Sequence, residues 1–135
     1  MRVVLDTNIL LISLPSRSPY HSIIQAFNER RFELVVSTPI FLEYEEILAM
    51  KANPFVASDI LGALLEAPNV INIDAYYYWE LISADPDDNK FTDAYMNGGG
   101  DYLVTNDSHF SQVKAIPFPK IQVVSATEFL AIISK

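Results

Sequence analysis

The chain has 135 residues, of which 50% are apolar and 19% charged, and its formal net charge at pH 7 is −8. These values are typical of one globular domain and exclude a disordered chain; the acidic charge also argues against a simple electrostatic binder of nucleic acid. Cysteine is absent and histidine occurs twice, which excludes disulfides and thiolate metal sites and argues against a histidine-rich zinc centre.

Nothing in the sequence predicts a membrane segment. No apolar run approaches the roughly 20 residues that a membrane-spanning helix needs. The apolar N-terminus is interrupted by Asp6 and Asn8 and no cleavage-like site follows, so we expect no signal peptide. We therefore expect a cytoplasmic protein that has no membrane partner.

Short β-branched runs alternate with helical patterns along the chain. In chain order the pattern predicts a strand over 2–5, helices over 9–14 and 20–30, a strand over 32–36, helices over 39–50 and 57–66, a strand over 70–73, helices over 76–83 and 88–96, strands over 102–104 and 121–124, and a helix over 126–133. Thr38 before Pro39 suits a helix start, and the glycines of 98–100 suit a helix end. Ser125 and Glu128 have the spacing of a capping box.

Alternating strands and helices of this length form right-handed βαβ units and hence a parallel sheet. We therefore expect an α/β fold, with three α/β/α layers around a mostly parallel central sheet, in a single domain over residues 1–135. In such a sheet ligands bind beyond the carboxyl ends of the strands. Residues that directly follow a strand are thus the first candidates for a site.

Acidic residues are concentrated in one part of the sequence. Residues 74–107 hold eight carboxylates and one base, Lys90. This excess is either a solvated face that aids solubility or a cluster whose repulsion a bound cation relieves. The position of each acid in the fold must decide between the two.

Two aspartates lie close behind predicted strands. Asp6 directly follows the strand over 2–5, and Asp107 follows the strand over 102–104 after two intervening residues. Asp107 can also cap a helix that starts at Ser108. Asp6 has no comparable structural role, since an unpaired charge at the end of an apolar strand is costly to bury.

Three glutamates occupy the helix after the second strand. At about 100° per residue, Glu43 and Glu45 flank the apolar stripe on opposite sides and Glu46 points further toward solvent. Helical phase does not choose between Glu43 and Glu45. Glu43 lies nearer the helix N-terminus, which abuts the sheet edge where Asp6 emerges, and is the favoured candidate.

The predicted helix over 88–96 begins within a group of aspartates. Asp88 flanks the buried face of this helix at its N-terminus, beside the same sheet edge. Asp85 and Asp87 lie in the preceding turn, where they either support a site or form the turn. Asp93 points away from the apolar face of the helix and is interpreted as a solvated charge.

Four carboxylates from separate segments are thus predicted to converge, namely Asp6, Glu43, Asp88 and Asp107. Four carboxylates within a few ångströms cannot all stay ionised without a cation. Hard oxygen ligands select Mg²⁺ or Mn²⁺ over zinc or copper. Such ions activate water and stabilise the charge that develops on a phosphodiester during hydrolysis.

At this point the sequence resembles a known family, the PIN domains. Residues 4–8 (VLDTN) resemble their opening motif, and residues 37–48, which include Glu43, resemble their second motif. Residues 85–91 (DPDDNKF) and 100–107 (GDYLVTND) are similar to the third and fourth motifs. The resemblance spans roughly residues 1–130, and the order, spacing and residue types agree together. Within the family, the chain is similar to the bacterial and archaeal toxins of the VapC type.

This resemblance implies a Mg²⁺- or Mn²⁺-dependent endoribonuclease that is often silenced by an antitoxin. The metal-binding acids carried over by motif are Asp6, Glu43, Asp88 and Asp107, and Asp85 is an alternative to Asp88 as the third acid. By the same motifs, Asn8 and either Thr105 or Asn106 would supply polar groups that support the acids. The implied partners are an RNA substrate, an antitoxin protein and further copies of the chain in a dimer or tetramer.

Two other functions stay open on the sequence. A phosphatase of the haloacid dehalogenase type also opens with a strand that ends in aspartate, but it needs an acid where this chain has Asn8. It also needs a lysine near the site, and Lys90 is the one nearby. The second alternative is a PIN scaffold that binds nucleic acid or assembles without catalysis.

Two further features have structural interpretations. The aromatic run over 76–79 (YYYW) could stack on RNA bases, but a core or a self-association face is the favoured interpretation. His109 lies two residues after Asp107 and could assist proton transfer, although it is interpreted as a surface histidine.

Overall fold

The structure is a computed structural model of the chain, and it describes residues 1–73 and 88–134. The elements in chain order are β1 (Arg2–Leu5), α1 (Thr7–Ser13), α2 (His21–Asn28), β2 (Glu33–Ser37), α3 (Thr38–Lys51), α4 (Pro54–Glu66), β3 (Val70–Ile73), α5 (Asn89–Gly98), β4 (Tyr102–Val104), the 3₁₀ turn η2 (Ser108–Phe110), α6 (Ser111–Lys114), β5 (Val123–Val124) and α7 (Ala126–Ile133). The predicted helix over 76–83 lies outside the described residues.

The strands form one five-stranded sheet in the order β3-β2-β1-β4-β5, and every neighbouring pair is parallel. The chain moves outward from β1 to β2 and β3, and then crosses to the other side of β1 to form β4 and β5. The direction of winding therefore reverses between β1 and β4, which is where open α/β sheets bind their ligands.

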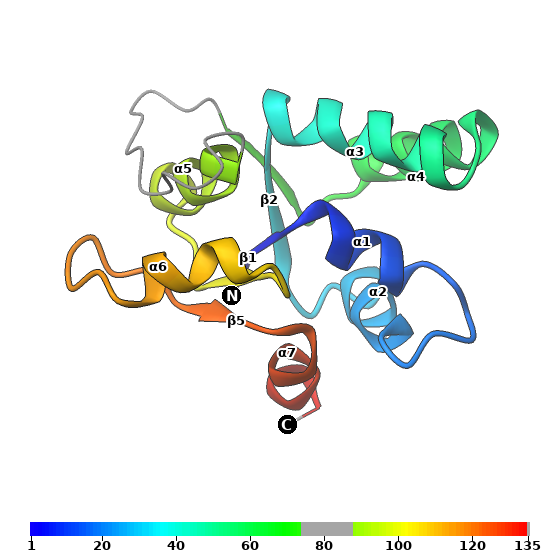
Figure 1. Cartoon of the computed structure of the whole chain (residues 1–135). Helices are drawn as coiled ribbons and strands as arrows, with labels where there is room; N and C mark the ends of the chain where they lie inside the picture. The colour runs from blue at the N-terminus through cyan, green and yellow to red at the C-terminus, as the bar shows by residue number, and fades with distance from the viewer. Residues whose placement is uncertain (74–87, 135) are drawn as a thin grey trace.

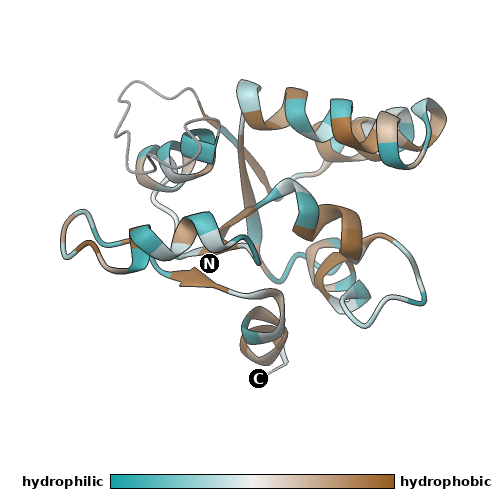
Figure 2. Cartoon of the chain, viewed as in Figure 1, coloured by the Kyte–Doolittle hydropathy of each residue, from teal (hydrophilic) through white to brown (hydrophobic). Residues whose placement is uncertain are grey.

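Helices cover both faces of this sheet (Figure 1). Helices α5 and α6 lie on one side, and α1 to α4 lie on the other, while α7 packs against α2. The predicted three-layer α/β/α fold with a parallel sheet is therefore confirmed. Figure 2 shows the strands as a largely apolar centre between helices of mixed character, as expected for a sheet that is covered on both faces.

The core lies on both faces of the three central strands. The side chains of Val3, Val4, Val35 and Val36 are fully buried. On one side, Phe32 meets Phe129 of α7 edge-on, with ring centroids 5.4 Å apart. On the other side Phe91 of α5 and Phe110 of η2 are 6.4 Å apart. These contacts tie α7 to the amino end of the sheet and α5 to η2, which follows β4.

Helix ends follow the local sequence signals closely. The capping box of α7 is present, since Ser125 accepts from the Glu128 amide and the Glu128 carboxylate accepts from the Ser125 amide. Helix α5 ends with Gly99 in the left-handed conformation at φ 65°, which favours glycine. The N-cap of α3 is Ser37, one residue before the predicted Thr38. Among the described helices, none combines the length and apolar character needed to cross a bilayer.

Candidate functional site

The register of β1 against β4 places Asp6 next to Thr105. Leu5 lies opposite Val104 in the parallel ladder, so the residues that follow each of them emerge side by side. The Asp6 amide donates to the Val104 carbonyl at 3.0 Å, and the Thr105 hydroxyl donates to Asp6 Oδ2 at 2.8 Å. Asp6 is only 6% exposed although it stands at the end of the sheet. The structure therefore places a buried carboxylate at the switch point.

The electrostatic surroundings of Asp6 disfavour its charge. Burial raises the pKa of this carboxyl above its ordinary value, and the negative charges of Glu43 and Asp107 raise it further. The hydrogen bonds from Thr105 and from the Thr7 amide act in the opposite direction without cancelling the rise. A positive ion beside Asp6 would therefore stabilise its ionised form.

Glu43 reaches the same corner from α3. The Thr7 hydroxyl donates to Glu43 Oε2, and Lys90 Nζ lies 2.8 Å from Glu43 Oε1. Glu45 and Glu46 of the same helix are exposed. The structure thus brings Glu43 to this corner and leaves Glu45 and Glu46 exposed. Helical phase left Glu43 and Glu45 open, and only closeness to the helix N-terminus favoured Glu43.

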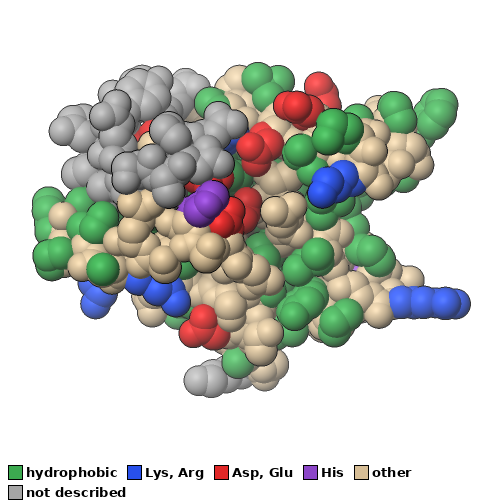
Figure 3. All heavy atoms as spheres, in the orientation of Figure 1, with side chains coloured by type: hydrophobic (Ala, Val, Ile, Leu, Met, Phe, Trp, Pro, Cys, Tyr) green, Lys and Arg blue, Asp and Glu red, His purple; other side chains and the backbone are tan. Residues whose placement is uncertain are grey.

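Asp88 and Asp107 meet around a histidine. His109 Nδ1 lies 3.4 Å from Asp88 Oδ2 and 3.5 Å from Asp107 Oδ1. Asp107 also accepts from the His109 amide at 2.9 Å, so it caps η2 as predicted. Figure 3 shows a histidine side chain among acidic ones on this face of the molecule. In the described part of the chain, these three residues form the one group of three possible metal ligands with atoms within 4.8 Å of one another.

The four acids are connected through their neighbours. Thr105 links Asp6 to Asp107, because its hydroxyl donates to the former and accepts from the amide of the latter at 3.0 Å. His109 links Asp107 to Asp88, and Thr7 links the Asp6 loop to Glu43. Asp6 and Glu43 nevertheless lie outside the tight group that Asp88 and Asp107 form with His109.

The supporting residues divide into three groups. Thr105 contacts Asp6 directly, whereas the Asn106 side chain accepts from the Ala126 amide at 3.0 Å and so anchors the loop to α7. Asn8 is exposed in the first turn of α1. Asp85, the alternative third acid, lies outside the described residues.

Two residues beside the acids, His109 and Lys90, contact them more closely than their sequence pattern indicates. His109 is interpreted above as a surface histidine, and its side chain is indeed 45% exposed, yet its ring lies between two of the acids. Lys90 is considered above only as a partner in phosphatase chemistry, and it pairs with Glu43. Lys90 follows Asp88 by two residues and His109 follows Asp107 by two, so their closeness in sequence to the acids was the available signal.

The predicted solvent exposure of Asp93 is wrong. Asp93 is 4% exposed, and five successive residues of α5, residues 91–95, are buried. Helical phase correctly identifies the face that packs on the sheet, but it does not report what covers the opposite face. Of the two acids interpreted as pointing to solvent, Glu46 is exposed and Asp93 is not.

Glu46→Gln should leave the cleavage activity that the motifs predict, and the melting temperature, close to those of the unaltered protein. Its side chain is exposed, and surface substitutions usually change the free energy of unfolding by less than about 0.5 kcal/mol. Cleavage rates and thermal melts of the two proteins check this. A large loss of activity would mean that Glu46, rather than Glu43, serves the site.

Tyr44→Phe should lower the free energy of unfolding by about 1 kcal/mol. The Tyr44 hydroxyl is fully buried and donates to the Leu5 carbonyl at 2.6 Å, directly before Asp6. Burial raises the pKa of this phenol, and the charges of Asp6 and Glu43 add to the rise, so it stays protonated as a donor. Urea denaturation of both proteins measures the difference; an unchanged midpoint would show that this bond adds no stability.

The donor set of this corner fits a divalent metal ion. Carboxylate oxygens are the ligands that Mg²⁺ and Mn²⁺ prefer, and a buried carboxylate with a raised pKa gains most from a nearby cation. Lys90 already pairs with Glu43, so a cation at that carboxylate would compete with this ion pair. Asp88, Asp107 and His109 offer ligand atoms within 4.8 Å of one another, and this group is the candidate metal centre.

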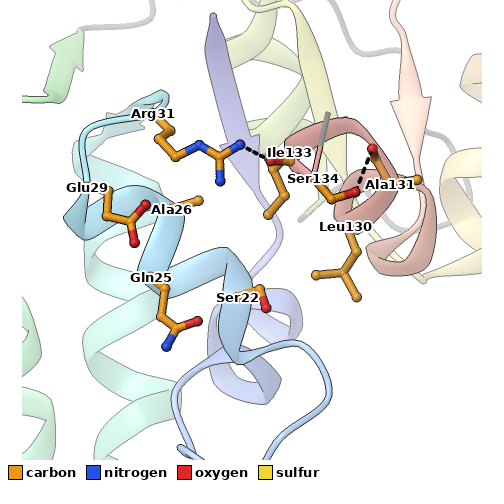
Figure 4. Close-up of a pocket in the computed structure, with 9 residues that line it drawn as sticks. All are labelled: Ser22, Gln25, Ala26, Glu29, Arg31, Leu130, Ala131, Ile133 and Ser134. Carbon is orange, nitrogen blue, oxygen red and sulfur yellow. Dashed lines mark hydrogen bonds between the residues drawn. The ribbon is translucent and has the colours of Figure 1, made fainter.

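A separate hollow lies between α2 and α7 (Figure 4). It has a volume of about 400 Å³, and the Arg31 guanidinium beside it donates to the Ile133 carbonyl. The lining holds one carboxylate, Glu29, and none of the four candidate acids. This hollow is therefore distinct from the candidate metal centre.

Comparison with known proteins agrees with the motifs and with the fold. The sequence model of the PIN domain matches residues 2–109. The chain belongs to the PIN-domain family. PIN domains are nucleases that generally use divalent metals, so the chain is a PIN-domain nuclease by family. No curated protein sequence matches the chain.

Three solved structures share the fold of this PIN domain. They are VapBC2 from Rickettsia felis bound to a promoter DNA fragment (16% identity, TM-score 0.65, 93% of this chain and 98% of the other covered), DNA-bound VapBC from Salmonella typhimurium (14%, 0.62, 93% and 98%) and VapBC-1 from nontypeable Haemophilus influenzae (16%, 0.61, 94% and 99%). At these identities the likeness shows the fold, which spans nearly the whole of each chain compared.

Proposed function

We propose that this PIN domain is a Mg²⁺- or Mn²⁺-dependent endoribonuclease and the toxin of a toxin–antitoxin pair. The observation that carries the proposal is the buried Asp6, whose pKa is raised and which shares one corner with Glu43 and Asp107. Asp88 joins this corner through His109. A corner of this kind is stabilised by a cation, and family membership supplies the nuclease chemistry.

Each side chain has a distinct part in this proposal. Asp6, Glu43, Asp88 and Asp107 would hold the metal, which when bound lowers the pKa of water and offsets charge on the phosphodiester. The Thr105 hydroxyl holds the Asp6 carboxylate, and Thr7 holds that of Glu43. These donors fix the acids in place before a cation arrives.

The acidic charge of the chain makes substrate binding depend on the metal. At a net charge of −8, the protein repels a phosphate backbone. A divalent cation between carboxylates and phosphate converts this repulsion into attraction. RNA binding and RNA cleavage should therefore both require the metal.

The proposed partner is an antitoxin that silences the nuclease in the cytoplasm. Support comes from the three structural neighbours, each of which was solved as a VapBC complex. Because the identities are 14–16%, an antitoxin for this chain remains a proposal.

Cleavage of end-labelled RNA and DNA pools tests the proposed function. The purified chain should cleave RNA with Mn²⁺ or Mg²⁺ and should lose this activity in EDTA, and added metal should restore it. Cleavage of DNA alone would contradict the RNA assignment. Cleavage that survives EDTA would contradict the metal dependence.

Family membership favours this proposal over a phosphatase. Asn8 stands where a haloacid dehalogenase phosphatase needs an acid, and Lys90 is paired with Glu43. Release of phosphate from a phosphomonoester by the chain, without cleavage of RNA, would reverse this preference.

The chain should self-associate in solution. Large apolar side chains on the described surface are strongly exposed, including Phe55 at 83% and Phe118 at 80%, and the aromatic run over 76–79 lies outside the described residues. Leu42, Met50, Phe55 and Leu65 are exposed on the neighbouring helices α3 and α4, and apolar residues gathered on one surface often mark an interface. Sedimentation velocity at roughly ten to a hundred micromolar, a range set by typical interface affinities, should show a dimer or tetramer. Monomer alone over that range would contradict the expectation.

A further inference from the structure

His109 is positioned among the candidate metal ligands by its own backbone. It is the central residue of η2, and its amide donates to Asp107 Oδ1 at 2.9 Å. The ring turns back so that Nδ1 lies 3.4 Å from Asp88 Oδ2 and 3.5 Å from Asp107 Oδ1. One nitrogen atom therefore faces one oxygen from each of two carboxylates.

The two sides of the acidic corner differ in what surrounds the carboxylates. Glu43 accepts from Thr7 at one oxygen and pairs with Lys90 at the other, and Asp6 accepts from Thr105. These partners are hydroxyl and ammonium groups that donate hydrogen bonds. While they donate, they cannot themselves bind a metal ion. On the other side, the partner that Asp88 and Asp107 share is an imidazole, which is itself a metal ligand.

We propose that His109 supplies a nitrogen ligand, through Nδ1, to a cation held with Asp88 and Asp107, so that the site prefers Mn²⁺ over Mg²⁺. This inference rests on the proposed metal-dependent function. Mg²⁺ prefers oxygen ligands and gives up its waters reluctantly, whereas imidazole binds transition metals more readily. Carboxylates alone would suit either ion, and the histidine nitrogen shifts the preference toward Mn²⁺.

The same ring atom can serve as a hydrogen-bond donor or as a metal ligand, because its role depends on the tautomer. In one tautomer Nδ1 donates to the carboxylates, and in the other its lone pair would be available to a cation. The side chain is 45% exposed, so a cation from solvent could reach the ring.

Metal titrations of His109→Gln test the assignment. His21→Gln is the matched control, because His21 is the other histidine of the chain and its ring contacts the Ser13 carbonyl at 2.9 Å. In calorimetric titrations, His109→Gln should weaken Mn²⁺ binding about tenfold or more while leaving Mg²⁺ binding unchanged. The His21→Gln protein should bind both ions as the unaltered chain does.

Pulsed electron paramagnetic resonance of bound Mn²⁺ gives a second readout that does not depend on activity. The unaltered chain and His21→Gln should show modulation from a coordinated nitrogen nucleus, and His109→Gln should lack it. The spectrum of the unaltered chain tests the ligand even where a variant folds poorly.

Three results would overturn the inference. Mn²⁺ bound without nitrogen modulation would leave the metal-dependent function intact and remove His109 as a ligand. Equal weakening of Mn²⁺ and Mg²⁺ in His109→Gln would show that the ring only orients the two carboxylates. Failure of the unaltered chain to bind either ion would overturn the proposed function together with this inference.

Discussion

Asp6→Asn should abolish RNA cleavage while the protein stays folded. Asp6 is the most buried of the four acids, and its carboxylate is fixed by Thr105 at the switch point of the sheet. Removal of residues that merely orient a metal ligand reduces affinity or activity about 10- to 100-fold, so loss of a ligand should reduce cleavage at least about a hundredfold.

The fold should tolerate this substitution because asparagine matches aspartate in size and shape. Its amide oxygen can still accept from the Thr105 hydroxyl. Loss of a charge that its surroundings disfavour removes repulsion from Glu43 and Asp107. Cleavage assays and circular dichroism melts, with Glu46→Gln as the control for a carboxylate on exposed surface, measure both effects. Full cleavage by folded Asp6→Asn would remove Asp6 from the site.

Divalent metal should raise the melting temperature, and by more at pH 8 than at pH 5. A cation binds the ionised acids and competes with protons, so its effect grows as the acids deprotonate. At a hundredfold excess over Kd, binding to the native state alone adds about 2.7 kcal/mol. For a domain of this size, that corresponds to a rise of roughly 10 °C.

The metal-free protein should show the opposite dependence on pH. The pKa of Asp6 is raised in the folded state, so the native state holds its proton at pH values where the unfolded chain has released it. The protonated Asp6 therefore adds to the free energy of unfolding. This contribution is complete below the ordinary pKa of aspartate and is lost as pH rises through the pKa that Asp6 has in the folded state. In Asp6→Asn this fall in stability should be absent.

Melts in EDTA, Mg²⁺ and Mn²⁺ at the two pH values test both dependences. The unaltered chain in EDTA should be less stable at pH 8 than Asp6→Asn. Metal should stabilise the unaltered chain and have much less effect on the variant. Equal metal-induced shifts in the two proteins would show that the ion binds elsewhere.

Much of the fold could be predicted from the sequence, because its strongest local signals are also its structural determinants. The strands β1, β3 and β4 have the predicted bounds, since short apolar β-branched runs between turns fit buried parallel strands. Helix α7 also has the predicted bounds, because its capping box fixes its start. For η2 only its start at Ser108, capped by Asp107, was predicted, and α6 was not predicted, since a single turn is too short to show helical periodicity.

The candidate site could be predicted wherever an acid is placed by topology. Asp6 and Asp107 follow adjacent parallel strands, so the strand order alone brings them together. To predict Glu43, both the helical phase and its closeness to the N-terminus of the helix were required. His109, Lys90 and Asp93 depend on which side chains of different elements meet, and a pattern within one segment does not contain that information.

A crystal of the chain soaked in Mn²⁺ tests directly whether these acids hold a divalent cation. The anomalous scattering of manganese locates the ion without reference to any assumed ligand. We expect a peak at the ends of β1 and β4, bounded by Asp6, Asp88 and Asp107. Peaks confined to exposed surface acids such as Asp59, with none at this corner, would contradict it.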